Sequence, residues 1–264
     1  MIAKIPHRVA WLRWLLLGYA LLTAYFSLSP WLGLRHGPWS TILLTVVGLL
    51  FAAGHAWFHL GSRRMVWFLG LTVVISLAFE SVGVKTGWIY GAYHYSDTLG
   101  PRFLGLVPYL IPAAWFMMVY PSRVIAERLI DGRWGAGWRR GLGVAALAAF
   151  VMTSWDLLMD PMMVLMRAWV WESPGAYFGI PVHNYVGWLL TTLTVYALFE
   201  VVARRLPEPG ERRVVAGSDA VWAYLITWAG NSIVAVQFGL VGPALVGLFT
   251  AGVLGSLALA RPSG

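Results

Sequence analysis

The sequence predicts an all-α integral membrane protein of about eight transmembrane helices, and two observations carry that prediction. Of its 264 residues 59% are hydrophobic and only 11% are charged, with a mean hydropathy of +0.70, whereas a soluble domain carries about 25% charged residues. The apolar residues are also grouped into long runs, each able to cross a hydrocarbon core of ~30 Å. We therefore expect a single polytopic membrane domain over residues 1–264.

Eight apolar runs make up most of the chain. They cover residues 9–28, 39–60, 66–81, 104–120, 141–163, 184–203, 220–238 and 240–260. No small-x-small cleavage site follows the first run, so we expect an uncleaved helix rather than a signal peptide. The third and fourth runs are short, and only Gly239 and Pro243 divide the last two. Seven spans therefore remain an alternative to eight.

The basic residues predict the orientation of the chain. With eight spans and a cytoplasmic N-terminus, 15 of the 19 Lys and Arg residues fall on the cytoplasmic side, and Arg35, Lys85, Arg102 and Arg167 fall outside. Such a bias is typical of a multi-pass protein of the plasma (inner) membrane with both termini in the cytoplasm. The net charge of +8 then reflects topology and contacts with anionic membrane lipids, and no nucleic-acid partner is expected.

Two predicted outside connections, residues 83–103 and 167–183, are long, rich in aromatic residues and poor in charge. Solvated loops are not usually built this way, so we expect two re-entrant or interfacial loops, shielded from lipid by protein or by a cavity. The chain also has no cysteine, which excludes disulfides, thiolate nucleophiles and iron–sulfur ligation.

The helix, aromatic loop and proline-led helix occur twice in the same order, which predicts a parallel internal repeat. The repeat units are residues 65–120 and 141–203. Pro and Trp lie seven residues apart in both, with an offset of 73 residues, and an acidic residue closes the preceding helix with an offset of 76. The matching segments are 108–115 with 181–188, 91–93 with 175–177, and Glu80 with Asp156. Chance similarity between Trp-rich apolar segments is the alternative.

Three carboxyl groups lie inside the predicted spans, where an ionisable group costs about 2.5–3.5 kcal/mol on insertion scales. Glu80 lies 15 residues past Met65, and Asp156 lies 15 residues past Gly141. Both are therefore ~22 Å along their helices, in the outer part of the bilayer. Asp160 follows one turn later on the same helix face as Asp156. We expect the three carboxyl groups to meet beneath the aromatic loops.

Buried carboxyl groups at one depth are typical of a proton-handling site, in which one acts as acid and another as base. Asp156 is expected to be the most sensitive position, since it shares a face with Asp160 and a depth with Glu80. The alternative is a structural role, through hydrogen bonds to backbone or pairing with Arg102 or Arg167. Pro161 predicts a kink or break just beyond this site.

The remaining polar residues give weaker signals. His55 and His59 have the i, i+4 spacing of metal ligands, but they lie near the cytoplasmic side and are expected to be packing residues, with no metal site. His94 and His183 could assist proton transfer. Asn184 could hold a water, and other polar residues in the spans, Asn231 and Gln237, more often join helices.

Two blocks of sequence resemble the membrane-embedded carotenoid 1,2-hydratases, a family that includes the bisanhydrobacterioruberin hydratases. The resemblance covers about residues 55–190, the expected catalytic core. It rests on residues 80–83, 87–95, 99–100, 107–115, 156–161, 169–171, 175–181 and 184–188. The remaining helices are similar only in number and apolarity.

The resemblance implies hydration, without a cofactor, of the terminal 1,2 double bond of an acyclic (ψ-end) carotenoid such as lycopene, giving a tertiary 1-hydroxy end group. Asp156, Glu80 and Asp160 would be catalytic. Further partners would be lipids and other carotenoid-pathway enzymes. The expected substrate-binding residues are Trp88, Tyr90, Tyr93, Tyr95, Trp115, Trp171, Tyr177, His183, Asn184 and Trp188.

Two other functions stay open. A membrane carotenoid (lycopene-type) cyclase also protonates an end group, but it would favour a dry pocket and a Pro-Glu-Glu motif within a span, whereas Pro207-Glu208 lies in a charged loop. A proton-coupled small transporter would also use intramembrane acids, usually with inverted repeats around a midplane site.

Overall fold

The computed structural model describes residues 9–130, 137–207 and 215–261. Five of the basic residues that predict the topology lie outside these ranges, namely Lys4, Arg8, Arg133, Arg212 and Arg213. Every predicted apolar run contains helix in the described part of the chain, although the run 104–120 becomes helical only at Leu110, after the strand β3 (Val107–Pro108). The helices are α1 (Ala10–Leu28), α2 (Trp39–Leu60), α3 (Ser62–Thr86), α4 (Leu110–Ile130), α5 (Trp138–Leu165), α6 (Val182–Ala203), α7 (Gly217–Gln237), α8 (Val241–Gly247) and α9 (Val253–Leu259).

Six of the described helices are long and apolar enough to cross a membrane. They are α1 with the adjoining 3-10 turn η2 (Ser29–Leu32), α2, α3, α5, α6, and the rod in which the π-helical turn η4 (Leu248–Gly252) joins α8 to α9. The protein is thus a polytopic helical membrane protein. The other two, α4 and α7, do not meet this measure, and α4 ends in a segment with Arg123, Glu127 and Arg128. The count of eight spans stays a prediction.

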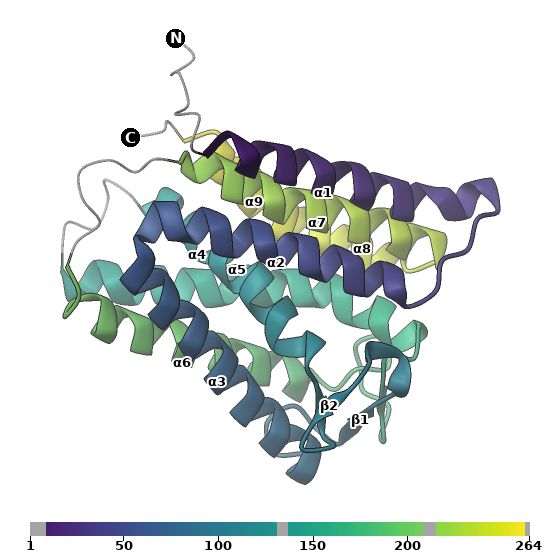
Figure 1. Cartoon of the computed structure of the whole chain (residues 1–264). Coiled ribbons are helices and arrows are strands. Elements are labelled where there is room, and N and C mark those ends of the chain that lie inside the picture. Colours follow the sequence, from purple (N-terminus) through teal and green to yellow (C-terminus); the bar gives the residue numbers. More distant parts are fainter. Residues whose placement is uncertain (1–8, 131–136, 208–214, 262–264) are drawn as a thin grey trace.

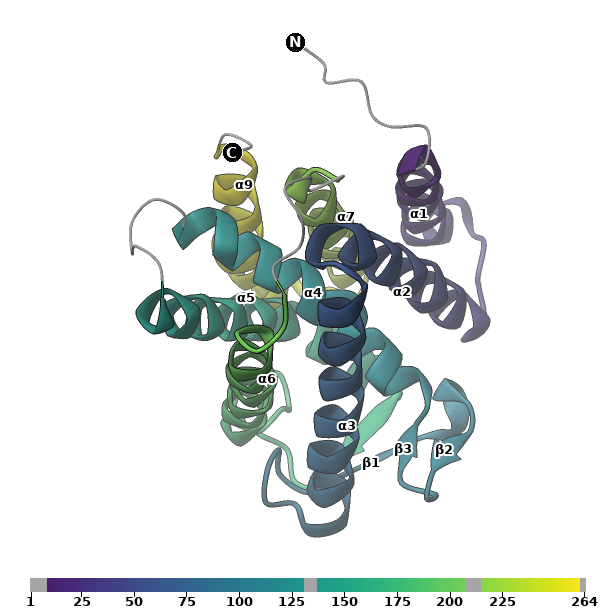
Figure 2. The ribbon, with the colours of Figure 1, turned by 60° about the vertical axis from the view of Figure 1, so that its left-hand side comes forward.

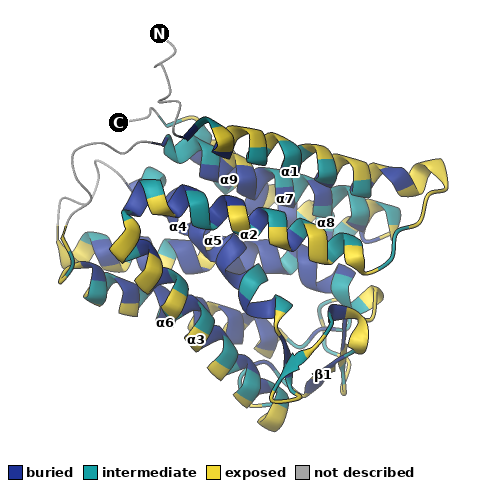
Figure 3. Cartoon of the chain, viewed as in Figure 1, coloured by how far each residue is buried: buried dark blue, intermediate teal, exposed yellow. Residues whose placement is uncertain are grey.

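The helix α4 lies in the centre of the bundle, in contact with α2, α3, α5 and α7 (Figure 2). It and α5 are largely buried, whereas the outer faces of α1, α2 and α3 are exposed (Figure 3). The exposed side chains are mostly apolar, as Trp14, Leu21, Trp67 and Val74 illustrate. Apolar outward faces are expected of helices that meet lipid rather than water.

The expected break at Pro161 is absent, because α5 continues to Leu165. Proline has no N–H to donate to the carbonyl four residues earlier, here that of Leu157. The hydroxyl of Tyr177 donates to this carbonyl at 2.9 Å. A side chain from the following connection thus replaces the missing backbone hydrogen bond, and the helix carries Asp156 and Asp160 on one unbroken face.

The two aromatic connections pair with each other, which the sequence did not predict. Strand β1 (Tyr93–Tyr95) lies antiparallel to β4 (Trp169–Trp171), with His94 opposite Val170. A second small ribbon joins β2 (Arg102–Phe103) to β3 (Val107–Pro108), after the 3-10 turn η3 (Asp97–Leu99). These strands gather at one end of the bundle, and the start of α1 and the end of α9 lie at the other (Figure 1).

A close backbone approach fixes the first connection against α6. A Cβ added at Gly187 would lie 2.3 Å from the carbonyl oxygen of Ile89 and 2.5 Å from the ring of Tyr90. Only glycine leaves room for this contact. The connections therefore fold back over the end of the helix bundle, and their entry into the bilayer stays a prediction.

Candidate active site

Glu80 lies near the end of α3, where its carboxylate is buried and accepts hydrogen bonds from three side chains. The hydroxyls of Tyr93 and Tyr95 both donate to Oε2, the latter at 2.8 Å. The indole N–H of Trp115 on α4 donates to Oε1 at 3.2 Å. Alternate residues of a strand point to one face, so β1 directs both phenols inward and leaves His94 exposed.

The two phenols are held as donors. Burial raises the pKa of Tyr93 and of Tyr95 well above the ordinary value, and the charge of Glu80 raises both further. Each hydroxyl therefore keeps its proton. Three donors on two carboxylate oxygens suit the ionised form of Glu80 and fix its direction.

Asp156 and Asp160 lie one turn apart on the same buried face of α5. Asp160 accepts from the indole N–H of Trp169 on β4 at 2.6 Å and from the amide of Asn184 on α6 at 2.6 Å. The same Asn184 nitrogen donates to Oδ2 of Asp156 at 3.3 Å. The other oxygen of Asp156, Oδ1, is buried without a hydrogen-bond partner among the described residues. The two aspartates thus share one amide donor.

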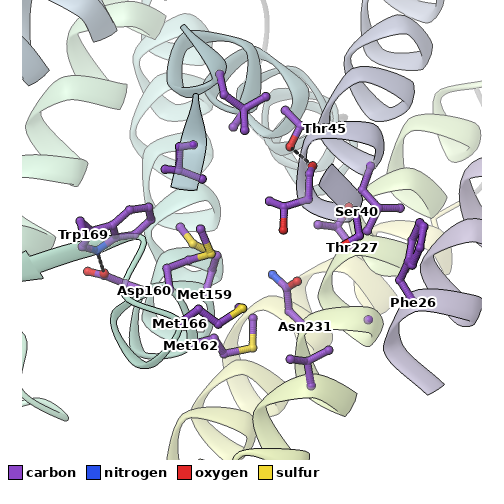
Figure 4. Close-up of a pocket in the computed structure, with 18 of the residues that line it drawn as sticks. Phe26, Ser40, Thr45, Met159, Asp160, Met162, Met166, Trp169, Thr227 and Asn231 are labelled. Atoms are coloured by element: carbon purple, nitrogen blue, oxygen red, sulfur yellow. Dashed lines mark hydrogen bonds between the residues drawn. The ribbon is translucent and has the colours of Figure 1, made fainter. Parts of the chain in front are cut away.

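A cavity of about 940 Å³ is lined by two of the acids and by aromatic residues, and Figure 4 shows Asp160 bonded to Trp169 at one side of it. This volume is at the upper end of the range for small-molecule sites, ~300–1,000 Å³. Glu80 and Asp160 both line the cavity, and the expected common depth of the three acids stays a prediction. The rings of Trp115 and Trp188 stack at 4.3 Å between centroids and 17° between planes. Other expected residues in the lining are Tyr90, Tyr93, Tyr95, Trp171 and Asn184.

Four expected residues do not line this cavity. Asp156 accepts a hydrogen bond from the Asn184 amide, and the hydroxyl of Tyr177 donates to the carbonyl of Leu157. Trp88 is 78% exposed, because it follows the end of α3 and faces outward. His183 is exposed on the first turn of α6, although its neighbour Asn184 is buried. The substrate-binding role predicted for Trp88, Tyr177 and His183 has no support from their positions.

The cavity also contains residues that the sequence did not single out. The indole N–H of Trp169 donates to Asp160. The pairing of β4 with β1 places Trp169 at this acid. A group of methionines lines the middle of the cavity, namely Met117, Met159, Met162, Met163 and Met166. The far part is formed by polar residues of α1, α2 and α7, helices that the family resemblance barely covers. Of these polar residues, only Asn231 and Gln237 have a role predicted from the sequence, which is to join helices.

The histidine pair on α2 lies outside the cavity. Nδ1 of His55 lies 2.5 Å from the hydroxyl of Tyr120, and its Nε2 lies 3.0 Å from the carbonyl of Ala216. Nε2 of His59 lies 3.8 Å from Glu127, which also pairs with Arg123 at 2.9 Å. Within the described ranges no three His, Cys, Asp or Glu side chains group to hold a metal ion. These contacts are those of packing residues.

The fold and the site define a class: a polytopic helical membrane protein with buried carboxyl groups facing an aromatic cavity. Residues 40–254 match the model of the family described as carotenoid biosynthesis protein. The chain belongs to this family.

A curated relative is the bisanhydrobacterioruberin hydratase of Haloarcula japonica, 33% identical over 180 residues. The aligned part is 67% of this chain and 59% of the relative, so the chain spans less than two thirds of that protein. No solved structure matches the chain.

Proposed function

We propose that this protein is a cofactor-independent hydratase that adds water to the terminal 1,2 double bond of an acyclic (ψ-end) carotenoid. The observation that carries the proposal is the cavity itself, in which Glu80 and Asp160 face one space walled by aromatic rings. Membership of a carotenoid biosynthesis family and likeness to a named hydratase supply the substrate class.

The reaction needs a proton donor, and the aspartate pair suits that role. Two adjacent buried carboxyl groups that share one amide donor repel each other when both are charged, so one proton on the pair is favoured. Asp160 lines the cavity and would deliver this proton to C2 of the alkene. Asp156, behind Asn184, would share the proton and return it to Asp160.

Protonation at C2 leaves a tertiary cation at C1, which carries two methyl groups. Trp115 and Trp188 line the cavity, and the stacked pair would stabilise the cation by cation–π attraction. A water molecule then attacks C1 and loses a proton to a carboxylate. Glu80, ionised and fixed by three donors, would orient that water and accept its proton. The proton on Glu80 would then return to the aspartate pair through water in the cavity, so the sum is one alkene and one water, giving one tertiary alcohol.

The surroundings of the acids suit a lipid-soluble substrate. Five methionines line the cavity next to them, and methionine adapts its shape to long apolar ligands. We propose a protein of the plasma membrane with both termini cytoplasmic and eight spans, whose strand-bearing end faces outward. Lipids and other carotenoid-pathway enzymes would be its partners.

Incubation of the purified protein in detergent with lycopene, without nucleotide or metal, tests the proposal. We expect a product heavier by one water. A product of unchanged mass with a ring at its end would identify a cyclase instead. Unchanged lycopene, together with proton-driven uptake of a solute into vesicles, would identify a transporter.

A further inference from the structure

The cavity has a polar part that the reaction at the acids does not explain. It lies between α1, α2 and α7, across the methionines from Asp160, and Figure 4 shows the amide of Asn231 directed into it. We call this part the polar arm. It consists of Thr23, Ser27, Ser40, Thr41, Thr45, Thr227, Asn231 and Gln237.

Two groups of the polar arm lack protein partners. The hydroxyl oxygen of Thr23 is buried near the hydroxyl of Tyr19, which is bonded to Thr227 at 2.8 Å, and it has no hydrogen bond of normal geometry among the described residues. The Asn231 amide likewise makes no hydrogen bond within the described part of the chain. A hydrocarbon chain would leave both groups unsatisfied, and the cost would be largest for the buried Thr23 hydroxyl, since Asn231 is half-buried. A small ligand that both donates and accepts hydrogen bonds fits these groups.

Neighbouring hydroxyls are oriented to accept. The Thr45 hydroxyl donates to the carbonyl of Thr41 at 2.9 Å, and that of Ser40 donates to the carbonyl of Gly37 at 2.9 Å. A hydroxyl that donates to its own helix keeps its oxygen lone pairs available. The walls of the polar arm therefore offer acceptors along α2 and an amide with two donors on α7.

The polar arm also reaches the surface. Gly33 and Arg35, in the connection between α1 and α2, are exposed and belong to the same continuous cavity as Glu80. The carboxyl groups are themselves buried beneath β1 and β4. A hydration reaction at these acids consumes one water per turnover, and the substrate, a hydrocarbon, cannot carry that water in.

We propose that the polar arm conducts water from the α1–α2 connection to the acids, an inference that rests on the proposed hydratase function. Water would pass from Arg35 along Thr23 and Asn231. It would then cross the methionines, whose unbranched side chains can move aside. Asn231 and Thr23 are positioning residues in this account, since they bind water on its way to the acids, where Glu80 orients the reacting molecule.

The chain has no cysteine, so single cysteines test aqueous access directly. We would make Thr23→Cys, Asn231→Cys and, as a second site on α2, Ser40→Cys. The matched control is Thr72→Cys on α3, since Thr72 is fully buried, bonds its own helix at the Phe68 carbonyl and does not line the cavity. A charged methanethiosulfonate reagent reacts with the thiolate, which forms only where water reaches the sulfur.

We expect the three arm cysteines to be labelled about tenfold faster or more than the control, because the control thiol is buried away from water. Labelling at the control rate in all three folded variants would overturn the proposal. This readout does not depend on activity. If the arm is labelled but lycopene is never hydrated, the proposed function fails while the aqueous arm stands.

Kinetics provide the second test. Asn231→Leu keeps the side-chain size but removes the amide, with Thr72→Val as the control. We expect kcat to fall about tenfold or more, a barrier change of about 1.4 kcal/mol, with the KM for carotenoid unchanged. Double-bond isomers should accumulate as the cation loses a proton instead. A raised KM with unchanged kcat would show that the arm binds carotenoid and would overturn the proposal, as would native values of both.

Discussion

Replacing Asp156 with asparagine removes a transferable proton while preserving the contacts of that side chain. Its Oδ2 accepts from Asn184, which an asparagine oxygen can also do, and its Oδ1 has no partner among the described residues. The new amide nitrogen can take the place of Oδ1 without displacing a donor. We therefore expect a change in the free energy of unfolding below about 1 kcal/mol, within the range of a single hydrogen bond.

The effect on activity should be much larger. Loss of a general acid typically lowers the rate 10²–10⁴-fold, which raises the activation barrier by about 3–5 kcal/mol. Asp160→Asn is the matched comparison one turn away, because both oxygens of Asp160 accept hydrogen bonds. An amide there must place its N–H against either Trp169 or Asn184. We expect that variant to lose about 1–3 kcal/mol of stability as well as activity.

Thermal unfolding in detergent and single-turnover hydration of lycopene would measure the two effects separately. Asp156→Asn should unfold close to the native temperature, bind carotenoid and leave the 1,2 double bond intact. A near-native rate for Asp156→Asn would show that Asp160 delivers the proton without help from Asp156, and the proposed sharing of the proton by the pair would be wrong. Activity in all the amide variants, Glu80→Gln included, would refute carboxylate catalysis at this site.

Three further predictions follow from the same contacts. Glu80→Gln should lose about 1–3 kcal/mol of stability, because an amide cannot accept from Tyr93, Tyr95 and Trp115 together; adding Trp115→Phe should recover part of that loss in thermal unfolding. Tyr177→Phe should cost a similar amount, since it leaves the Leu157 carbonyl unpaired, while the carotenoid KM stays native; a raised KM would restore its predicted binding role. A reporter at Gly264, outside the described residues, should remain cytoplasmic in intact cells, and an outside signal would contradict the topology.

The helices and the meeting of the acids were predictable because both depend on local features. Apolar runs of about 20 residues fix the helices. Equal distances from the helix starts predicted that Glu80 and Asp156 lie at one depth, and Asp160, one turn beyond Asp156, lines the same cavity as Glu80. The resemblance to the family's motifs predicted most of the aromatic residues that line the cavity. Of the kink or break expected at Pro161, the break was wrong, because local proline chemistry cannot reveal a hydroxyl that arrives from Tyr177, 20 residues later.

Long-range pairing accounts for what the sequence did not reveal. Trp169 reaches Asp160 only because β4 pairs with β1, two segments that are more than 70 residues apart. The polar arm combines residues from opposite ends of the chain, such as Thr23 and Thr227, and the adjoining Tyr19 donates or accepts a hydrogen bond of 2.8 Å with Thr227. Serine and threonine in an apolar helix usually bond their own backbone, so their sequence carried no sign of a shared cavity.

The predicted duplication would explain why the site contains unlike carboxyl groups. The offset of 76 residues that relates Glu80 to Asp156 also relates β1 to β4, and these strands pair antiparallel about His94 and Val170. Trp115 and Trp188, matched at an offset of 73, stack face to face. Antiparallel pairing and stacking of equivalent elements are the contacts that a local two-fold axis produces.

Two acids related by such an axis would have had the same surroundings before the two halves of the chain diverged. In this chain the surroundings differ: Glu80 has three donors, whereas Asp156 has one shared amide and a second carboxyl group, Asp160, one turn away. Donors favour the carboxylate form, and a neighbouring carboxyl group favours retention of a proton. Divergence of the two halves would thus convert a symmetric pair into one base and one acid, the combination that addition of water to an alkene requires.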